Sequence, residues 1–389
     1  MRNVAIIAEY NPFHNGHSYQ FSCLKQLKAD TITVCMSGNF VQRAEPAIME
    51  KHRRAETAIL CGADLVIELP FRYSISSAED FAFGGISLID SLKYVDTLCF
   101  GSENGDINNL LEIVNNIENA DKLGYISEFI KTGVSYPKAI HLSLERLGIK
   151  YRIEKPNDIL AVEYIKNLKK LNSNIKPYTI KRIGDYHSNQ SRGDILSASA
   201  IRNRIKKGKD VDKYIPIEAM KIIKEEKNNF TDIENIERII LAKLRLLVLE
   251  KDKIKNNLYN MGEGLENRIL KYAGSNSLIE LYKNAKTKRY PMSSIRRAVL
   301  TLFFEQEKDD IISPPYIHVL AFNNKGRKLL RELRDLPIPV FHTLPSLAEG
   351  NMVKFIKEEC MATDIFNLAG KKIGNSGQEF TLGSVYVNV

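Results

Sequence analysis

The sequence lacks the usual marks of secreted, membrane-spanning and metal-binding proteins. Its cysteines form no Cys-x-x-Cys pair, and four of the five lie in apolar stretches, which predicts reduced core thiols rather than disulfides. The first residues lead into a short strand-like run and do not resemble a signal peptide. No apolar run is long enough to cross a membrane. We therefore expect a cytoplasmic protein with no membrane association and no implied stable protein partner.

The bulk composition favours a globular protein that binds a polyanion. The 389 residues allow two or three domains, and 44% of them are hydrophobic, which is enough for a substantial core. The formal net charge of +9 favours a nucleic acid as partner. A general lysine-rich bias in composition is the alternative explanation for this charge.

Strand-like and helical segments alternate over the first two hundred residues. Apolar runs at 4–7, 31–36, 64–70, 95–100 and 178–183 are separated by helical patterns, one of which, 78–92, contains Gly84 and Gly85 and reads as an interrupted helix. This alternation predicts an α/β, Rossmann-like parallel sheet at 1–205, whose carboxyl-end loops share one rim. Long charged helical stretches, including 233–250 and 265–284, then predict a mainly helical domain at 206–389. Its last part, from 314 on, mixes strand-like pieces with helices and is the least informative.

The loop between the first strand and the first helix carries two histidines. In the run Tyr10-Asn11-Pro12-Phe13-His14-Asn15-Gly16-His17, Gly16 lets a ligand approach the backbone, and the following helix start offers free N–H groups. His14 and His17 could donate hydrogen bonds to phosphate oxygens during phosphoryl or nucleotidyl transfer. A zinc site is disfavoured, since no third histidine or cysteine lies nearby. The alternative is a histidine pair that is merely solvated or packed in the core.

Two further segments have the composition of anion-binding sites. In Leu196-Ser197-Ala198-Ser199-Ala200-Ile201-Arg202, either serine could start a helix that has Arg202 one turn inside, which predicts a second anion clamp. An ordinary capped helix with a surface arginine would look the same. Basic residues interleaved with tyrosine farther on suit RNA phosphates and base stacking, although a solvated helix is equally compatible. The candidate RNA-binding residues are Lys286, Lys288, Arg289, Tyr290, Arg296 and Arg297.

These segments resemble two signatures of the nucleotidyltransferase superfamily that includes class I aminoacyl-tRNA synthetases. The run His14-Asn15-Gly16-His17 is similar to its H-x-G-H motif, and residues 196–202 are similar to I-S-x-[ST]-x-[IL]-R, with Leu196 in place of isoleucine. More closely, the chain resembles the tRNA(Met) cytidine acetate ligase family, through matching segments at 9–17, 36–43, 66–70, 100–103, 155–158 and 288–297.

The resemblance implies an activity and its reactants. Members of that family activate acetate with ATP as acetyl-AMP, releasing pyrophosphate. They then acetylate N4 of the wobble cytidine, position 34, of elongator tRNA(Met). ATP is thus an expected substrate, Mg²⁺ is expected to bind through its phosphates, and no protein metal site is implied.

The resemblance also implies a set of site residues. We expect catalytic roles for His14, His17, Arg43, Ser197, Ser199 and Arg202. The family's ATP-binding positions fall on Ile7, Ala8, Glu9, Tyr10, Asn11, Pro12, Phe13, His14, Asn15, Gly16, His17, Ser18, Tyr19, Gln20, Gly101, Asn157 and Arg182. One position departs from the family pattern: Ala44 stands where glycine is common, although alanine adopts positive φ only at a cost.

Two other functions are compatible with parts of this pattern. An adenylyltransferase that makes a nucleotide cofactor would share both signatures but would not need a large basic helical domain. A non-catalytic RNA-binding protein could keep the fold without using the histidines.

Overall fold

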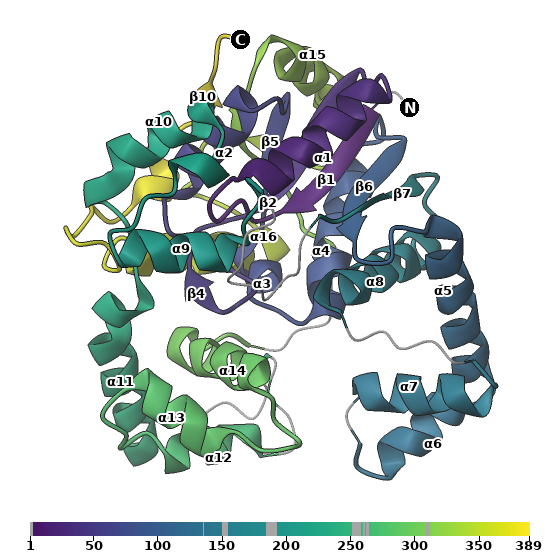
Figure 1. Cartoon of the computed structure of the whole chain (residues 1–389). Coiled ribbons are helices and arrows are strands. Elements are labelled where there is room, and N and C mark those ends of the chain that lie inside the picture. Colours follow the sequence, from purple (N-terminus) through teal and green to yellow (C-terminus); the bar gives the residue numbers. More distant parts are fainter. Residues whose placement is uncertain are drawn as a thin grey trace.

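A mostly parallel sheet forms the centre of the molecule (Figure 1). The computed structural model describes residues 3–134, 136–149, 155–183, 193–250, 258–259, 261, 264–307 and 312–389. The strands lie in the order β10-β8-β5-β2-β1-β6-β7, and β9 pairs with β8. Five of them follow the predicted strand-like runs: β1 (Asn3–Ala8), β2 (Thr31–Ser37), β5 (Leu65–Leu69), β6 (Thr97–Ser102) and β7 (Lys176–Lys181). These five pair in parallel, which confirms the predicted fold class.

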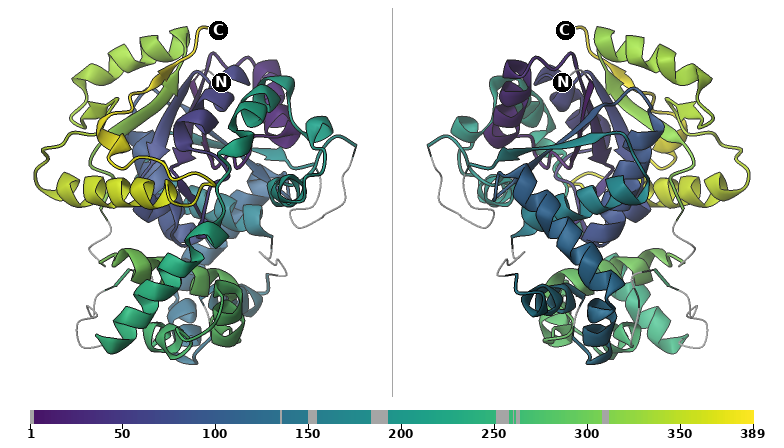
Figure 2. Two further views of the ribbon diagram at one scale, coloured as in Figure 1. Left: turned by 90° about the vertical axis from the view of Figure 1, so that its left-hand side faces the viewer. Right: turned by 90° about the vertical axis from the view of Figure 1, so that its right-hand side faces the viewer.

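Alternate residues of the central strands face two helical layers. Val4 and Ile6 of β1 belong to the core that includes Phe21 and Leu24 of α1, whereas Ala5 belongs to the opposite core. The first layer holds α1 (Asn15–Gln26), α2 (Lys51–Leu60), α9 (Ala198–Lys206) and α10 (Ile217–Glu225), and the second holds α4 (Ala78–Ser91), α5 (Ile107–Lys122) and α8 (Pro156–Lys170). The two views of Figure 2 show these layers from the sides.

Helix α4 is continuous, contrary to the predicted interruption at Gly84 and Gly85. A Cβ at Gly84 would lie 2.3 Å from Cγ of Tyr73, and one at Gly85 would lie 2.7 Å from Cδ1 of Ile7. The two glycines therefore allow α4 to pack closely against its neighbours, and they do not end the helix.

The last part of the chain returns to the sheet. Strand β8 (Ile317–Phe322) pairs antiparallel with β5, and β10 (Val385–Tyr386) and β9 (Val340–Phe341) pair with β8. The prediction of a mainly helical domain throughout 206–389 is thus incomplete, because α10 and these strands share the cores of the sheet. These strands alternate with α15 (Asn324–Glu332) and α16 (Asn351–Phe366).

A helical lobe lies below the sheet in Figure 1. It consists of α11 (Ile233–Leu249), α12 (Leu265–Lys271), α13 (Leu278–Ala285) and α14 (Met292–Phe304), which surround a third core that continues to Phe40 and Phe71 of the sheet domain. The helical stretch predicted at 265–284 therefore consists of two helices. The lobe docks on the sheet domain through Phe304, whose ring centroid lies 4.7 Å from Phe71 and 5.5 Å from Phe40.

The remaining elements are short or peripheral. They are β3 (Phe40–Val41) and β4 (Glu45–Pro46), which pair as a two-stranded sheet, α3 (Phe71–Ser74), α6 (Tyr125–Lys131), α7 (Tyr136–Arg146), and the 3-10 helices η1 (Asp212–Tyr214), η2 (Glu226–Asn228), η4 (Leu333–Asp335) and η5 (Gln378–Phe380). Within the described ranges, no helix combines the length and apolar character that a membrane span requires.

Candidate active site

The two histidines cap the helix that carries them. His14 is the residue before the first turn of α1, and its Nδ1 accepts a hydrogen bond from the backbone N–H of Gly16 at 3.0 Å. His17 lies three residues later, and its Nδ1 accepts from the backbone N–H of His14 at 3.2 Å. This reciprocal arrangement has the pattern of a capping box, with imidazole nitrogens as the acceptors. It fixes both rings at the amino end of α1.

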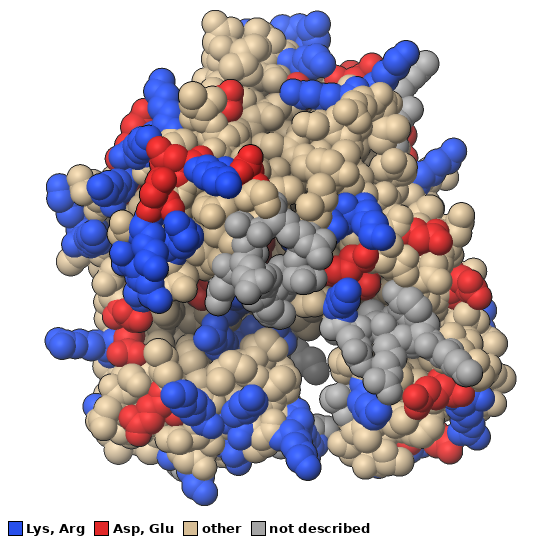
Figure 3. Space-filling model, in the orientation of Figure 1, with Lys and Arg blue, Asp and Glu red and all other residues tan. Residues whose placement is uncertain are grey.

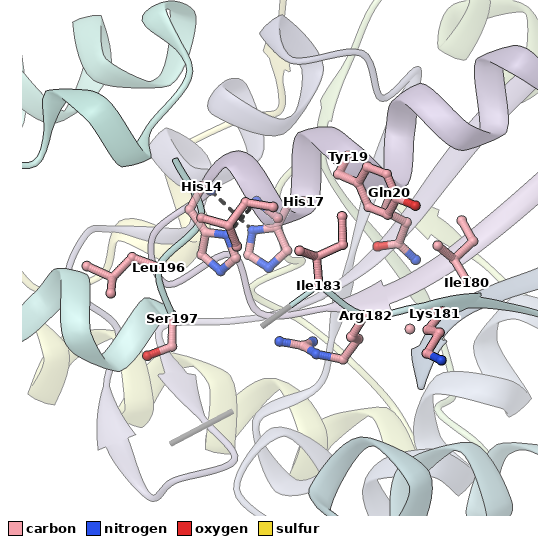
Figure 4. Close-up of a pocket in the computed structure, with 13 residues that line it drawn as sticks. His14, His17, Tyr19, Gln20, Ile180, Lys181, Arg182, Ile183, Leu196 and Ser197 are labelled. Atoms are coloured by element: carbon pink, nitrogen blue, oxygen red, sulfur yellow. Dashed lines mark hydrogen bonds between the residues drawn. The ribbon is translucent and has the colours of Figure 1, made fainter. Parts of the chain in front are cut away.

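The same hydrogen bonds determine where each neutral ring carries its proton. A neutral imidazole has one donor and one acceptor nitrogen, so an accepting Nδ1 places the hydrogen on Nε2. Burial, together with the positive charge of Arg182, lowers the pKa of His14 to about 3, and burial also lowers the pKa of His17. Both rings are therefore neutral near pH 7 and present an Nε2–H donor. They stack with centroids 3.8 Å apart, and their outer nitrogens point towards the space between Ser197 and Arg182 (Figure 4).

An aromatic cluster supports the two rings from behind. Tyr10 and Phe13, both 1% exposed, lie with their centroids 4.8 Å and 5.3 Å from that of His17. Phe21 of α1 packs against both of them. These residues of the predicted ATP-binding run thus hold the histidines in place, although they do not line the pocket themselves.

A pocket opens beside the histidine pair. It is lined by His14, Gly16, His17, Tyr19, Gln20, Gly101, Ile180, Lys181, Arg182, Ile183, Ile195, Leu196 and Ser197. One part of this lining is aliphatic, which suits a nucleobase, and another part carries imidazole, ammonium, guanidinium and hydroxyl donors, which suit phosphates. Seven of the predicted ATP-binding residues and one of the predicted serines therefore meet in one pocket.

Arg182 links the pocket to the start of α8. Its Nη1 donates to Oδ1 of Asn157 at 3.2 Å, and Nδ2 of Asn157 donates to Glu103 at 2.6 Å. A Cβ at Gly101 would lie 3.1 Å from Cγ of Arg182, so the missing side chain leaves room for this arginine beside β6. Asn157 does not line the pocket but orients the arginine that does. The carboxylate of Asp158 accepts from the backbone N–H groups of Glu103 and Asn104, which ties the β6 loop to α8.

The amino end of α9 forms the opposite wall. Ser197 caps this helix, with Oγ accepting from the backbone N–H of Ala200 at 3.3 Å. Ser199 lies in the first turn, and the two hydroxyl oxygens are 3.2 Å apart. The amide of Asn15 donates to the backbone carbonyls of Asp194 and Lys213, so the start of α1 is fastened to the segments that flank α9.

Two of the predicted catalytic arginines are not among the residues that line the pocket. Nη1 of Arg202 donates to the carbonyl of Asn11 at 2.8 Å, and its Nη2 lies 2.8 Å from the carboxylate of Glu45. Burial raises the pKa of Glu9, and the charges of Arg202 and Arg43 partly offset this effect. Both arginines therefore lie near the first loop, where Arg202 supports its backbone. Ala44 beside them has φ +57°, the left-handed conformation that glycine adopts more easily.

The predicted RNA-binding residues lie on the helical lobe. Lys286, Lys288 and Arg289 are exposed, and Tyr290 is half-buried. Arg296 is 38% exposed, lies 3.9 Å from Glu45 and approaches the Tyr282 ring at 5.4 Å. Basic side chains are visible over this lobe in Figure 3, where an opening separates it from α6 and α7.

Arg297 has a different environment from these residues. It is half-buried and donates to Ser294, and burial lowers its pKa. It is therefore the least suited of the six to an RNA contact.

The described lining of the pocket contains no carboxylate. The described residues do include one group with metal-ligand geometry, Glu68, His318 and Glu379, which is buried elsewhere. Nζ of Lys51 lies 2.8 Å from Glu68 and is also paired with Glu379. Its ammonium thus already supplies the positive charge that these carboxylates require.

Several lining residues were not predicted as site residues. Leu196 was quoted only as part of the second motif, Ile195 precedes it, and Ile183 follows Arg182. Ile180 and Lys181 are the last residues of β7. The basic end of this strand was a usable signal for Lys181. The aliphatic residues gave none, because an isoleucine beside a ligand looks like any core isoleucine.

Comparison with known proteins gives consistent results. A model of the family described as HIGH Nucleotidyl Transferase matches residues 1–379. A protein of Thermoanaerobacter sp. (strain X514) named tRNA(Met) cytidine acetate ligase is 40% identical, covering 97% of this chain and 98% of its own length. One of the same name from Clostridium novyi (strain NT) is 36% identical over the full length of both chains.

Solved structures agree with these sequence matches. The crystal structure of Thermotoga maritima TmcAL in its apo form I superposes with a TM-score of 0.90 at 30% identity, covering all of both chains. A second structure of that protein, bound with alpha-thio ATP, superposes with a TM-score of 0.89.

Proposed function

The chain belongs to the tRNA(Met) cytidine acetate ligase family, and on that premise we propose that it joins acetate to a cytidine of tRNA(Met) at the expense of ATP. The enzyme activates acetate as acetyl-AMP and then acetylates N4 of the wobble cytidine of the elongator tRNA. A tRNA substrate also favours the cytoplasm as its location. The main structural support for this chemistry is the pair of neutral imidazoles at the start of α1. Their Nε2–H groups face the pocket.

We place the triphosphate across the amino ends of α1 and α9. Nε2–H of His14 and of His17 would donate to oxygens of the α- and β-phosphates, where negative charge grows during the reaction. Arg182 and the α9 cap at Ser197 would hold the far side of the phosphate chain, and the aliphatic residues near Gly101 would receive the adenine. Arg202 and Arg43 would then act on the first loop, and Arg202 would be a positioning residue through the Asn11 carbonyl.

The first step requires positioning and charge stabilisation more than covalent chemistry by the protein. A carboxylate oxygen of acetate attacks the α-phosphorus, the bond from that phosphorus to the bridging oxygen breaks, and pyrophosphate leaves with the electron pair. Mg²⁺ would be carried by the phosphates, because the described pocket lining offers it no carboxylate. Neutral histidines suit this site, because they donate hydrogen bonds to the phosphates without adding a positive charge that would repel the metal ion.

The second step transfers the acetyl group. The exocyclic amine of the cytidine attacks the acyl carbon, the bond to the phosphate oxygen breaks, AMP leaves, and the nitrogen loses a proton. A base in an anticodon loop is unpaired and can be turned out towards a pocket, so duplex disruption is not required.

We propose that the helical lobe of α11–α14 holds the tRNA. Lys286, Lys288 and Arg289 are exposed there, and Tyr290 adds an aromatic face beside them. Beyond the predicted boundary near residue 205, the RNA-binding role would thus belong to the helical lobe, whereas β8 and β10 extend the sheet of the catalytic part.

One experiment tests the function directly. The enzyme is incubated with ATP, isotope-labelled acetate and a tRNA(Met) transcript, and the tRNA is digested and analysed by mass spectrometry. Labelled N4-acetylcytidine at the wobble position is the expected product. ATP–pyrophosphate exchange is measured alongside, and it should depend on acetate. Exchange driven instead by a nucleoside monophosphate would indicate an adenylyltransferase and contradict the proposal.

A double variant separates RNA binding from acetate activation. Lys288→Ala with Arg289→Ala should weaken tRNA binding. It should also reduce the slope of binding affinity against salt concentration, because each phosphate contact contributes to that slope. Acetate-dependent exchange requires no tRNA and should persist. Equal loss of both activities would argue against an RNA-binding role for this lobe.

A further inference from the structure

A second pocket lies between α15 and the outer strands β8 and β9, away from the ATP pocket. Three arginines border it, namely Arg327 and Arg331 on α15 and Arg334 on η4. Its floor contains the apolar side chains of Phe322, Leu330 and Val340. The pocket is open to solvent, and its volume is about 370 Å³, which is within the range of small-molecule sites. Figure 1 shows α15 at the end of the molecule opposite the helical lobe.

All three arginines are exposed, and none forms an ion pair or a side-chain hydrogen bond with a residue that the structure describes. No acidic residue belongs to the described lining. Arg327 and Arg331 are four residues apart on one helix face, where like charges repel each other and destabilise the helix. The arrangement thus has a small energetic cost that a bound anion would remove.

Packing and hydrogen bonds hold the aromatic side chains of the pocket in place. The rings of Phe322 and His342 meet edge to face with centroids 5.8 Å apart, and Tyr386 packs on Phe322 at 5.6 Å. Oγ of Ser384 donates to the carbonyl of Val319 at 2.6 Å, so it accepts from Nδ1–H of His342 at 2.7 Å. His342 is therefore oriented by its hydrogen bond, and its Nε2 remains available to a ligand.

We propose that this α15 pocket binds a nucleotide phosphate. Planar guanidinium groups match phosphate oxygens in pairs, and several of them on one wall distinguish a phosphate from a lone carboxylate. The Phe322 and His342 rings with the apolar floor suit a base or ribose next to that phosphate. The nucleotide is either free in solution or one unit of the bound tRNA, and both sources share this chemistry. The site is separate from the ATP pocket, so the proposal stands apart from the reaction itself.

The test uses the full chain with its ATP pocket filled by a non-hydrolysable ATP analogue. Inorganic pyrophosphate is then titrated by calorimetry into the wild type and into Arg331→Gln with Arg334→Gln. We expect one further binding site in the wild type and at least tenfold weaker binding in the double variant. Lys328→Gln is the matched control, because Lys328 is exposed on the same helix but does not line the pocket, and it should change binding less than twofold.

A second arm distinguishes the two sources of phosphate. Binding of a tRNA(Met) transcript is measured for the same variants at several salt concentrations. Weaker binding with a smaller salt slope in the double variant assigns the site to the tRNA, whereas unchanged tRNA binding with lost pyrophosphate binding assigns it to a free nucleotide. If neither ligand distinguishes the double variant from Lys328→Gln, the proposal is wrong.

A folding defect would not obscure the result. The unfolding temperature of each variant is measured first. Arg331→Lys provides a milder change, because it keeps the charge and loses the planar fork, and we expect intermediate pyrophosphate affinity for it.

Discussion

Each histidine of the pocket has two tasks that reside on different atoms of one ring. Nδ1 accepts a backbone hydrogen bond at the start of α1, and Nε2–H faces the pocket. Because the tasks are separate, a substitution can remove one and keep the other. Asparagine is a good residue at the position before a helix, and glutamine three residues later completes a capping box.

The variant His14→Asn with His17→Gln should therefore fold and lose catalysis. We expect its unfolding free energy to lie within about 1 kcal/mol of the wild type, because the caps are retained. Acetate-dependent ATP–pyrophosphate exchange should fall by about two to three powers of ten, which is typical of a lost charge-stabilising donor. Urea unfolding and the exchange assay measure the two quantities. Full exchange activity in a folded variant would exclude the histidines from the reaction.

The lowered pKa values of these rings predict how stability depends on pH. An unfolded histidine has a pKa near 6.5, whereas His14 in the fold has a pKa of about 3. Between these values the unfolded chain binds a proton that the folded chain does not. Stability should thus be fully present above pH 6.5 and fall on acidification, by up to about 1.4 kcal/mol per pH unit for one ring. Denaturant unfolding between pH 7 and pH 5 should show a shallower fall in the double variant than in the wild type.

The buried ammonium of Lys51 gives a second prediction at this scale. It is 1% exposed and pairs with Glu68 and Glu379, and although burial opposes it, the Lys51 charge together with His318 lowers the pKa of Glu68. Lys51→Met would leave buried carboxylates without their cation, which typically costs about 3–5 kcal/mol. Urea unfolding measures the loss. The exposed pair of Lys93 with Asp90 is the control, and Lys93→Met should cost less than about 1 kcal/mol.

The sequence predicted where the reactive residues gather but not what each one does. Both histidines and Ser197, which two short motifs indicated, line one pocket with Gly101 and Arg182, which the family resemblance implied. The hydrogen bond from Arg202 to the Asn11 carbonyl joins residues far apart in the sequence, and no local pattern records it. The predicted role of Arg202 in an anion clamp stays a prediction.

At the scale of elements, close packing explains two glycines that look like helix breakers. Gly84→Ala should gain up to about 1 kcal/mol in helix propensity. The new Cβ would nonetheless lie 2.3 Å from the buried ring of Tyr73, and overpacking of this kind costs about 1–3 kcal/mol. We expect net destabilisation in thermal unfolding. Gly274→Ala, where no atom lies within 4 Å of the added Cβ, is the matched control and should show none.

The elements were predictable where their signal is local. Buried parallel strands such as β2 and β5 are continuous apolar runs of β-branched residues, and the sequence locates them to within about two residues. The place of β8 in the sheet was not predictable, because its partner β5 lies some 250 residues earlier and the two run antiparallel. The break between α12 and α13 falls in the polar run Gly274-Ser275-Asn276-Ser277, where Ser277 caps α13, so the sequence did carry a signal for it.

At the scale of the whole molecule, Glu45 connects the sheet domain to the lobe. It lies on β4, 2.8 Å from Arg202 near the first loop and 3.9 Å from Arg296 on α14. Glu45→Gln removes the charge that draws both arginines together and keeps the size of the side chain. We expect transfer of acetyl to tRNA to fall several-fold, with a smaller effect on ATP–pyrophosphate exchange. If exchange falls as much as transfer, Glu45 acts within the sheet domain alone.

The return of the chain to its own sheet has a consequence during synthesis. The residues up to the end of the lobe emerge from the ribosome before β8 and β10, so β5 keeps an open edge until the final segment is released. The nascent protein can assemble its histidine loop early, yet its sheet is completed last. We therefore expect chains truncated before residue 317 to depend on chaperones and to aggregate, although they retain every residue of the ATP pocket.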